Sequence, residues 1–333
     1  MQSDGGSQEI MGTFNRIIVV AKSARQAKKC IDAGFTEMRR IDSVMSDYKS
    51  DSELSKVNRE AFAGPVKITP ELFWIFQKSI EFSKLSDGQF DITVGPLVDL
   101  WHKAAETNQM PDENTIAQTK SRVGYEKLIL DVNNMTVKFA VDGMRIDLGA
   151  IGKGYAVDKA YEKMLAMGAI AGMVDSGGNI RCFGRPLDKD AWTVGIQDPR
   201  VDMSVSLLVL KLNDMSVATS GDYQRFNVVA GQKMSHIIDT KTAKGAGKLA
   251  SDTIICKTAT DADGLSTTIN LLGPDKGLAL IESLSVSPQG ERDLAIGGQS
   301  LAIGGPDTEC ILITPAPEYR IIKSKGVDAY ISN

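Results

Sequence analysis

The chain has 333 residues, which exceeds the usual size of a single hydrophobic core, so we expect one large domain or two packed subdomains that share a cleft. Lys and Arg number 38 against 42 Asp and Glu, which gives a net charge of −4. This balance argues against binding to nucleic acid or to an anionic membrane surface. The cysteines form no CxxC pair, which excludes the common zinc-cluster and thioredoxin patterns.

The first part of the chain predicts a strand followed by helices. Residues 1–10 are polar and glycine-containing, as in a flexible leader, and residues 11–333 are then expected to form one domain. Residues 14–21 are rich in branched apolar side chains and predict a strand. An amphipathic helix follows, because apolar residues recur at three- and four-residue spacing: Ile31, Phe35, Met38, Ile41 and Met45.

A second helix is predicted to begin after Thr69, a plausible N-cap followed by Pro70. From Leu128 onward short β-like runs dominate, with one helix expected over residues 153–167. Strands and helices that are segregated in this way favour an α+β fold over strict βαβ alternation. Near the C-terminus LAIGG occurs twice, at 294–298 and 301–305, and two copies predict a glycine-containing loop or hairpin rather than a solenoid.

The segment TATDADGLSTTINLLG, residues 258–273, has the strongest chemical pattern. Thr258 or Thr260 can cap a helix on which Asp263 and Thr267 lie four residues apart, and therefore on one face. Two oxygen ligands that point the same way suit Mg²⁺ and a phosphate-bearing substrate. The alternative is an Asp that caps the helix and a Thr that hydrogen-bonds back to its own helix.

Three glycine-containing segments are candidates for binding an anion. DLGAIGKGY, residues 147–155, places three glycines and Lys153 where a strand meets a helix, so its backbone amides could approach a phosphate. VDSGGNIR at 174–181 and TSGDY at 219–223 are turns that expose amides and polar side chains. Tight strand-to-helix packing and ordinary β-turns are the alternatives.

His236, in SHIIDTKTAKG, is one of two histidines in the chain. The alternation that follows it suggests a strand ending in a polar turn, so the side chain could lie at the edge of a cleft. A titration near neutral pH suits a general base, although a lone histidine is more often a hydrogen-bonded structural residue. His102 has no potential partner nearby in the sequence.

The ordered series of motifs resembles the ApbE family, the FAD:protein FMN transferases. The segments that carry the resemblance cover about residues 11–284 and are Met11-Gly12-Thr13, MSDYKSDSELSKVN, DGQFDITVGPLVDLW, DLGAIGKGYAVD, VDSGGNIRCFG, WTVGIQDP, VATSGDYQRF, SHIIDTKTAKG and TATDADGLSTTINLLGPDKGLALIE. The resemblance implies mostly antiparallel sheets flanked by helices, with an FAD cleft between two subdomains. It also implies Mg²⁺-dependent transfer of the FMN half of FAD to a Ser or Thr hydroxyl of an acceptor flavoprotein, with release of AMP.

The resemblance also implies roles for individual residues. Asp263 and Thr267 match the metal ligands, and the carbonyl of Ala150 would complete the protein's share. His236 matches the histidine that accepts the proton of the incoming hydroxyl, and Tyr48 matches a position beside the flavin ring. The remaining FAD contacts would come from Met11, Lys153, Asp175, Ser176, Gly177, Gly178, Asn179, Gly221 and Asp222.

Two motifs depart from the family pattern. Thr240 and Ala243 replace a common proline and glycine after His236, which concerns the position of the acceptor more than flavin binding. Gly264 replaces the alanine that often follows the metal-binding aspartate, and a glycine inside a helix suggests a local need for space.

The same residues are compatible with two other functions, and the resemblance implies a location. The same metal site could serve an FAD pyrophosphatase that produces FMN and AMP, and a non-catalytic FAD-binding protein is a third hypothesis. The family also implies an extracytoplasmic, periplasmic location with a possible lipid anchor. The polar leader could then be the remnant of a longer precursor.

Overall fold

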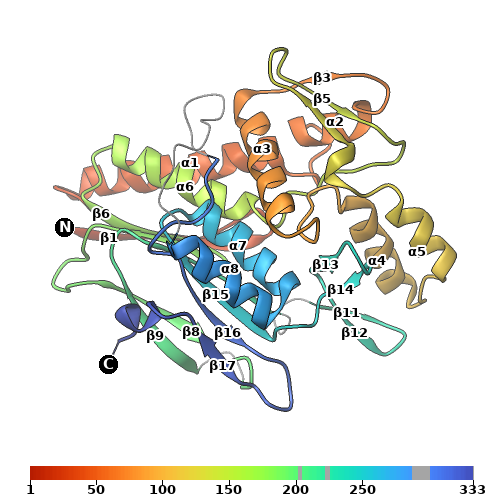
Figure 1. Cartoon of the computed structure of the whole chain (residues 1–333). Helices are drawn as coiled ribbons and strands as arrows, with labels where there is room; N and C mark the ends of the chain where they lie inside the picture. Colours follow the sequence, from red (N-terminus) through yellow and green to blue (C-terminus); the bar gives the residue numbers. More distant parts are fainter. Residues whose placement is uncertain (202–204, 222–225, 287–300, 333) are drawn as a thin grey trace.

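The computed structural model describes residues 1–201, 205–221, 226–286 and 301–332. Its largest element is an eight-stranded sheet in which every neighbouring pair of strands is antiparallel (Figure 1). In spatial order the strands are β1 (Gln2–Ile10), β2 (Thr13–Val20), β6 (Ala171–Ser176), β7 (Asn179–Phe183), β10 (Ser216–Gly221), β15 (Ser251–Cys256), β16 (Glu309–Ile313) and β17 (Ile321–Lys323). The prediction of an α+β fold is confirmed.

Both faces of this sheet are covered, which explains why β15 is buried at every position. Ile254 and Cys256 pack under helices, whereas Ile255 points to the opposite face, as the two-residue period of a strand requires. The helices on the first face are α1 (Ala24–Met45), α6 (Gly152–Ala166), α7 (Ala259–Leu272) and α8 (Pro274–Val286). The hairpin of β8 (Trp192–Gln197) and β9 (Ser206–Leu212) covers the second face.

A second group of elements lies against the outer side of α7 (Figure 1). It comprises α2 (Glu53–Glu60), α3 (Pro70–Leu85), α4 (Gly95–Thr107), α5 (Glu113–Lys120), the short helix η1 (Tyr125–Lys127) and a small sheet of β3 (Val66–Lys67), β5 (Thr136–Phe139) and β4 (Leu128–Asp131). One buried cluster joins Phe82 of α3 to Leu265 and Ile269 of α7. A Cβ added at Gly264 would lie 2.5 Å from the Phe82 ring, so the glycine provides the space that the sequence suggested.

Two small hairpins and a short terminal helix complete the described structure: β11 (Phe226–Val229) with β12 (Gln232–Ser235), β13 (Ile238–Asp239) with β14 (Lys244–Gly245), and η2 (Val327–Tyr330). Trp101 of α4 donates its ring N–H to the carbonyl of Ala243, 2.8 Å away, and so ties α4 to the second hairpin. Within the described ranges, no helix combines the length and apolar character needed to cross a membrane.

The structure corrects the prediction of a flexible leader. Residues 2–10 form β1, which pairs along its length with β2, so backbone hydrogen bonding orders this polar segment despite its composition. The predicted stripe of α1 is confirmed as buried, and Thr69 caps α3 as expected. The first LAIGG copy lies outside the described residues, and the second forms neither helix nor strand.

Lys78 fastens the C-terminal segment to the helices. Its side chain is 3% exposed and its ammonium lies 2.6 Å from the Asp261 carboxylate in the first turn of α7. The same group donates to the carbonyls of Leu301 and Ala302. The counter-ion and the carbonyl acceptors offset the cost of burying the lysine's charge. Lys78 thus joins α3, α7 and the chain beyond residue 300.

Replacing Lys78 with Met should lower the free energy of unfolding by about 3–5 kcal/mol, because Asp261 would remain buried without its counter-ion. Chemical denaturation followed by circular dichroism measures this change. Lys28→Met is the control, since Lys28 pairs with Asp32 on the exposed face of α1, and it should cost less than about 0.5 kcal/mol. Equal effects of the two substitutions would contradict the role assigned to Lys78.

Candidate functional site

Asp263 lies in the second turn of α7, where this helix contacts the start of α6. Its side chain is buried, and one carboxylate oxygen accepts a 2.8 Å hydrogen bond from the backbone N–H of Gly154. Lys153 lies on the other side, with its ammonium 3.7 Å from the second oxygen and 2.9 Å from the carbonyl of Gly149. The positive end of α6 therefore faces the carboxylate directly.

The approach of the two helices depends on Gly154. A Cβ at this position would lie 2.7 Å from the Cβ of Asp263 and still closer to the carbonyl of Ala259. Any side chain at residue 154 would therefore separate α6 from α7. Gly154 therefore allows close packing of the two helices, which was one of the two interpretations of this glycine motif. Its backbone N–H also donates to a carboxylate.

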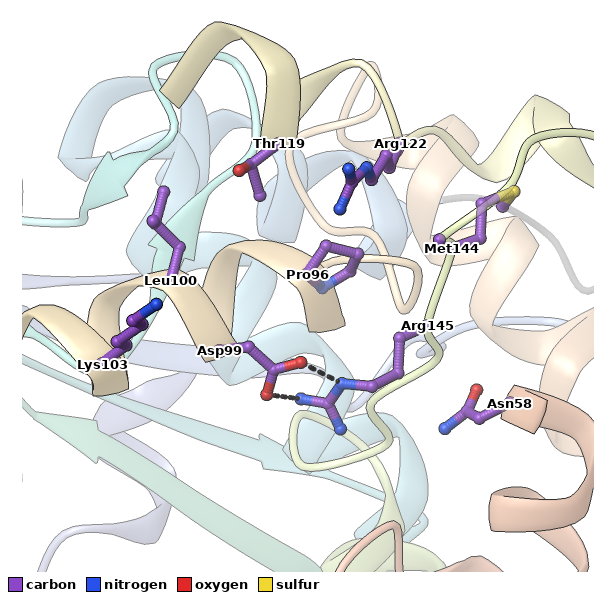
Figure 2. A pocket seen from close by; sticks show the side chains of 10 residues that line it. Asn58, Pro96, Asp99, Leu100, Lys103, Thr119, Arg122, Met144 and Arg145 are labelled. Carbon is purple, nitrogen blue, oxygen red and sulfur yellow. Dashed lines mark hydrogen bonds and ion pairs between the residues drawn. The ribbon is translucent and has the colours of Figure 1, made fainter. Parts of the chain in front are cut away.

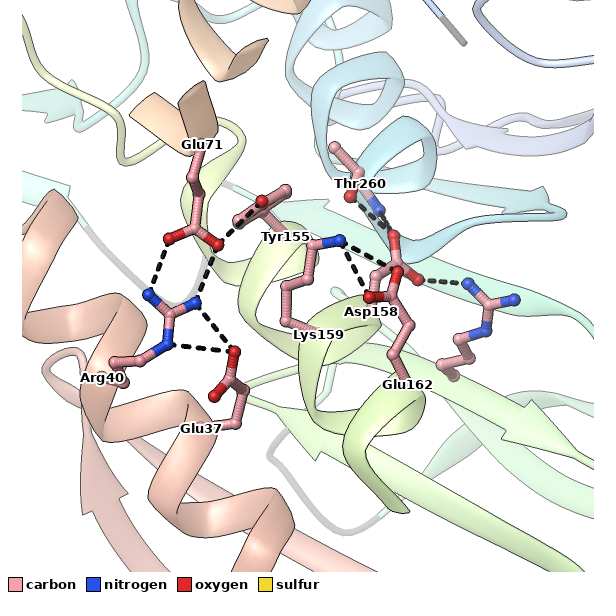
Figure 3. A network of polar contacts seen from close by, with 9 residues as sticks. Glu37, Arg40, Glu71, Tyr155, Asp158, Lys159, Glu162 and Thr260 are labelled. Carbon is pink, nitrogen blue, oxygen red and sulfur yellow. Dashed lines mark hydrogen bonds and ion pairs between the residues drawn. The ribbon is translucent and has the colours of Figure 1, made fainter. Parts of the chain in front are cut away.

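Asp158 caps α7 in return. Its carboxylate accepts hydrogen bonds from the N–H groups of Ala259 and Thr260, at 3.0 and 2.8 Å, and from the Thr260 hydroxyl at 2.6 Å. Arg181 of β7 pairs with the same carboxylate (Figure 3). Each helix thus places an aspartate at the N-terminus of the other, which fixes their mutual register.

A second polar cluster holds α6 against α1 and α3 (Figure 3). The Tyr155 hydroxyl donates to Glu71 over 3.0 Å, and Arg40 bridges Glu71 and Glu37 with contacts of 2.7 and 2.8 Å. Residue 155 directly follows the N–H donor of Gly154. Side chains from two other helices therefore fix the position of that donor.

The structure does not support either alternative for the Asp263 and Thr267 pair. The N-cap of α7 is Thr258, so Asp263 does not cap its own helix. Thr268 donates back to the carbonyl of Gly264, whereas Thr267 is half-buried and its hydroxyl has no hydrogen-bond partner among the described residues. The Thr267 hydroxyl and the Asp263 oxygen that does not accept from Gly154 are therefore available to an external group.

The carbonyl of Ala150 is a third available oxygen. In a continuing helix it would accept from the N–H of Gly154, four residues later, but that N–H donates to Asp263. No other described group donates to this carbonyl. A carboxylate, a hydroxyl and a carbonyl are the hard oxygen donors that Mg²⁺ takes, so the residues present fit that ion. Lys153 adds a charge suited to a phosphate.

The predicted glycine turn at residues 175–179 lies beside the turn that contains Met11. Gly177 donates its N–H to the carbonyl of Phe14 at 3.1 Å, and a Cβ at Gly177 would collide with Thr13. Asp175 accepts from the N–H of Gly178 over 2.9 Å, and its burial raises the pKa of its carboxyl group. The Ser176 hydroxyl is buried without a partner in the described structure.

Met11 connects these turns to the start of α6. The residue has a φ of 56° and its terminal methyl lies 3.6 Å from where a Cβ of Gly152 would be. Asn179 pairs with Ala218 in β10, and Gly221 ends that strand. The structure thus places Met11 beside the start of α6, and the turn at residues 175–179 beside Thr13. Asp222 lies outside the described residues.

A polar cluster that was not predicted from the sequence also fixes α7. The Ser266 hydroxyl lies 2.7 Å from both the Ser220 hydroxyl and the Asp252 carboxylate, and Asn270 donates to Asp252 over 2.9 Å. Ser266 and Asn270 are four residues apart on α7 and polar within an apolar helix, a signal that could have revealed them. The cluster fixes the rotation of α7 relative to β10 and β15.

Tyr48 lies on an exposed segment after α1, and its side chain is 81% exposed. Its neighbour Asp47 pairs with Arg145, which also binds Asp99. Burial, and then the nearby charge of Asp147, raises the pKa of Asp47. Tyr48 is therefore placed on the side of the site where the motif starting at Asp147 begins.

His236 lies in an exposed bend between β12 and β13. Gln89 ties this hairpin to α7, because its amide lies 3.3 Å from the Asp239 carboxylate and 3.4 Å from the carbonyl of Leu271. Thr240, at the position where proline is common in the family, donates instead to the carbonyl of Gly88. The departure from the family pattern therefore adds an anchor for the turn.

Asp91 fixes the segment that carries Gln89. Its carboxylate accepts from the N–H and hydroxyl of Thr93, both at 2.8 Å, and from the N–H of Tyr125 at 2.6 Å. These hydrogen bonds lower its pKa, but burial outweighs them and raises the pKa to about 6. The folded protein therefore binds this proton more tightly than the unfolded chain does.

The Asp91 carboxyl group should titrate with a midpoint of about 6, against about 3.9 in the unfolded chain. Its contribution to stability is present in full below the unfolded value and is lost as the pH rises through the folded value. Carboxyl ¹³C NMR measures the midpoint, and Asp91→Asn assigns the signal. A midpoint below 4 would contradict the dominance of burial.

Asp158→Asn should lower the free energy of unfolding by about 1–3 kcal/mol, because Arg181 loses its partner and the α7 N-terminus loses an anion. Hydrogen exchange of the Ala259 and Thr260 amides should become faster. Thermal denaturation and exchange mass spectrometry measure the two effects. Glu162→Gln breaks the pair with Lys159 on the same helix and is the control; it should change neither the stability nor the exchange rates. Unaltered exchange in Asp158→Asn would refute the mutual capping.

Solved structures share the fold. The crystal structure of the ApbE protein of Thermotoga maritima superposes with a TM-score of 0.85 and covers 100% of both chains at 28% sequence identity. The flavin transferase ApbE of Vibrio cholerae superposes with a TM-score of 0.80 and covers 99% of each chain at 24% identity, which supports the fold alone.

Sequence comparisons agree with the structural ones. The FAD:protein FMN transferase of Haemophilus influenzae is 34% identical over 252 residues, which cover 74% of this chain and 73% of that protein. The protein of the same name from Escherichia coli K12 is 30% identical over 283 residues, 83% and 81% of the two chains. The profile of the ApbE family matches residues 11–288. The chain therefore belongs to the ApbE family.

Proposed function

We propose that this protein transfers the FMN moiety of FAD to a Ser or Thr hydroxyl of an acceptor flavoprotein and releases AMP. One observation supports this proposal most strongly: among the described residues, no hydrogen bond occupies the second Asp263 oxygen, the Thr267 hydroxyl one turn further along α7, or the Ala150 carbonyl just before α6. Three oxygen donors beside a lysine suit a divalent cation and a diphosphate. FAD is inferred as the substrate because the relatives are named FAD:protein FMN transferases.

The chain's own residues would bind and orient the substrates. Lys153 would contact a phosphate oxygen of FAD, and the exposed ring face of Tyr48 would stack on the isoalloxazine. The turn at residues 175–179, with Met11 next to it, would receive the adenosine half. The site therefore runs from the Met11 turn, past Lys153 and Asp263, to Tyr48.

The transfer exchanges the phosphoanhydride bond of FAD for a phosphate ester bond on the acceptor. The acceptor oxygen attacks the phosphorus of the FMN half and forms a new P–O bond, while the bond from that phosphorus to the bridging oxygen breaks and AMP leaves with this oxygen. His236, in its exposed bend, would accept the proton of the hydroxyl. A Mg²⁺ held by Asp263, Thr267 and Ala150 would offset the charge that develops on the diphosphate.

Hydrolysis of FAD to FMN and AMP is the second candidate. The exposure of Tyr48 and His236 favours it, since water can reach both side chains. The two reactions differ only in whether water or an acceptor hydroxyl attacks. A non-catalytic FAD-binding protein would not need metal ligands such as Asp263 and Thr267.

Incubation of the protein with FAD, Mg²⁺ and candidate acceptor domains separates these functions. Mass spectrometry of the acceptor should reveal one added FMN on a Ser or Thr, with AMP in solution. FMN and AMP with an unlabelled acceptor would indicate the hydrolase, and unchanged FAD would indicate the binding protein.

Asp263→Asn should reduce both transfer and FAD cleavage by about 100-fold or more, because the metal loses its anionic ligand. This carboxylate also contributes to stability, since it is buried and satisfies the Gly154 N–H. Asn, unlike Ala, keeps an acceptor for that N–H, so the fold should persist in circular dichroism. Calorimetric titration should show weakened Mg²⁺ binding. Asp32→Asn, on the exposed face of α1, is the control, and normal transfer by Asp263→Asn would refute the metal site.

We also propose that the protein acts outside the cytoplasm and is lipid-anchored in its native form. This location is supported by the family resemblance alone. Sequencing of the native N-terminus, together with cell fractionation, would test it.

A further inference from the structure

One hydroxyl group of α7 joins this helix to two strands of the large sheet. The Ser266 hydroxyl lies 2.7 Å from the Ser220 hydroxyl of β10 and 2.7 Å from the Asp252 carboxylate of β15. Ser220 and Asp252 are directly opposite each other in the antiparallel register, so both side chains lie on the face that α7 covers. A helix and two strands therefore meet at Ser266.

The number of available hydrogens fixes the direction of these hydrogen bonds. As a carboxylate, Asp252 can only accept, so the single hydroxyl hydrogen of Ser266 is donated to it. The Ser220 hydroxyl then donates to the Ser266 oxygen. Asn270, one turn further along α7, donates its amide to the other Asp252 oxygen over 2.9 Å. The hydrogen bonds from Ser220 through Ser266 to Asp252 thus run in one direction.

Water cannot replace these contacts, because Ser266, Asp252 and Asn270 are all buried. The ion pair of Asp99 and Arg145 is different, since it borders a cavity of 340 Å³ (Figure 2) and the Asp99 side chain is exposed. Solvent can take over the hydrogen bonds of such a pair. Within the cluster around Asp252, a group that loses its partner remains unsatisfied.

Each of the two serines directly precedes a residue of the proposed site. Ser266 precedes Thr267, the proposed metal ligand, and Ser220 precedes Gly221, the last residue of β10 and a proposed FAD contact. The hydrogen bond between the serines therefore sets the position of the metal ligand on α7 relative to the FAD-binding end of β10. Without this bond, α7 can shift against β10.

We propose that Ser266 and Asp252 are positioning residues that hold Thr267 and Gly221 in place for the joint binding of Mg²⁺ and FAD. Neither residue touches the metal or the substrate, and each acts through its neighbours. The N–H of Gly154 already fixes Asp263 from the side of α6. The cluster around Asp252 fixes the second proposed ligand of α7 from the side of the sheet. This inference rests on the proposed function.

Ser266→Ala removes the shared hydroxyl and leaves Thr267 and Ser220 unchanged. Calorimetric titration should show that Mg²⁺ binds about tenfold more weakly, and the KM for FAD should rise by a similar factor. The kcat at saturating Mg²⁺ and FAD should stay nearly constant, because no group that takes part in the transfer is lost. Thermal denaturation identifies the temperature range in which the variant is folded.

Two further variants separate positioning from general stability. Asp252→Asn keeps an acceptor for Ser266, and its amide can donate to the Asn270 oxygen, which has no partner in the described structure. It should therefore bind Mg²⁺ more tightly than Ser266→Ala does. Thr253→Val is the control, because the hydroxyls of Thr253 and Thr219 lie 3.0 Å apart between the same two strands, on the face away from α7. It should leave both affinities unchanged.

Ser220→Ala is a second test that does not depend on a fully buried position, since Ser220 is half-buried. It breaks the bond between β10 and α7 and should also weaken the binding of Mg²⁺ and FAD. Unchanged affinities in folded Ser266→Ala or Ser220→Ala would overturn the inference and leave the transfer function intact. Equal losses in Thr253→Val would also overturn it. A wild-type protein that transfers no FMN would instead contradict the function on which this inference rests.

Discussion

The hydrogen bond from the Gly154 N–H to Asp263 is the contact on which the site depends. It diverts an amide that would otherwise bond to the carbonyl of Ala150, and it does so while Asp158 caps α7 in the opposite direction. Two helices that cap each other cannot slide independently, because a shift of one turn would leave both aspartates and several amides buried without partners. The same arrangement that stabilises the pair therefore leaves oxygen atoms free for a ligand.

The rest of the molecule holds this pair of helices in place. Tyr155 and Glu71 fix α6 on the side of α1 and α3, the cluster around Asp252 fixes the rotation of α7 over the sheet, and Phe82 fills the space that Gly264 leaves. The covered antiparallel sheet provides a rigid base beneath them. The exposed segments that carry Tyr48 and His236 surround this fixed centre, which suits a site that must admit two large substrates.

The sequence predicted what depends on local pattern. The stripe of α1, the cap of α3 and the pairing of Asp263 with Thr267 on one face of α7 all follow from spacing within one element. Contacts between distant elements had no such signal: Asp158 reaches a helix that begins 101 residues later. Strand β1 was missed because its polar composition resembles a leader, while its order comes from pairing with β2. The roles of His236 and Tyr48 rest on family resemblance, since exposed side chains leave no packing pattern.

The contacts of Lys78 have a consequence for how the protein folds. The Lys78 ammonium has all its hydrogen-bond acceptors only when the carbonyls of Leu301 and Ala302 are in place, and both residues lie far beyond α3 in the sequence. Its carboxylate partner, Asp261, belongs to the helix that carries Asp263. Lys78 therefore has its ionic partner within the helices, but its two carbonyl contacts form only when residues 301–302 dock against them. The position of the helix that carries Asp263 is thus coupled to a segment that lies far away from it in the sequence.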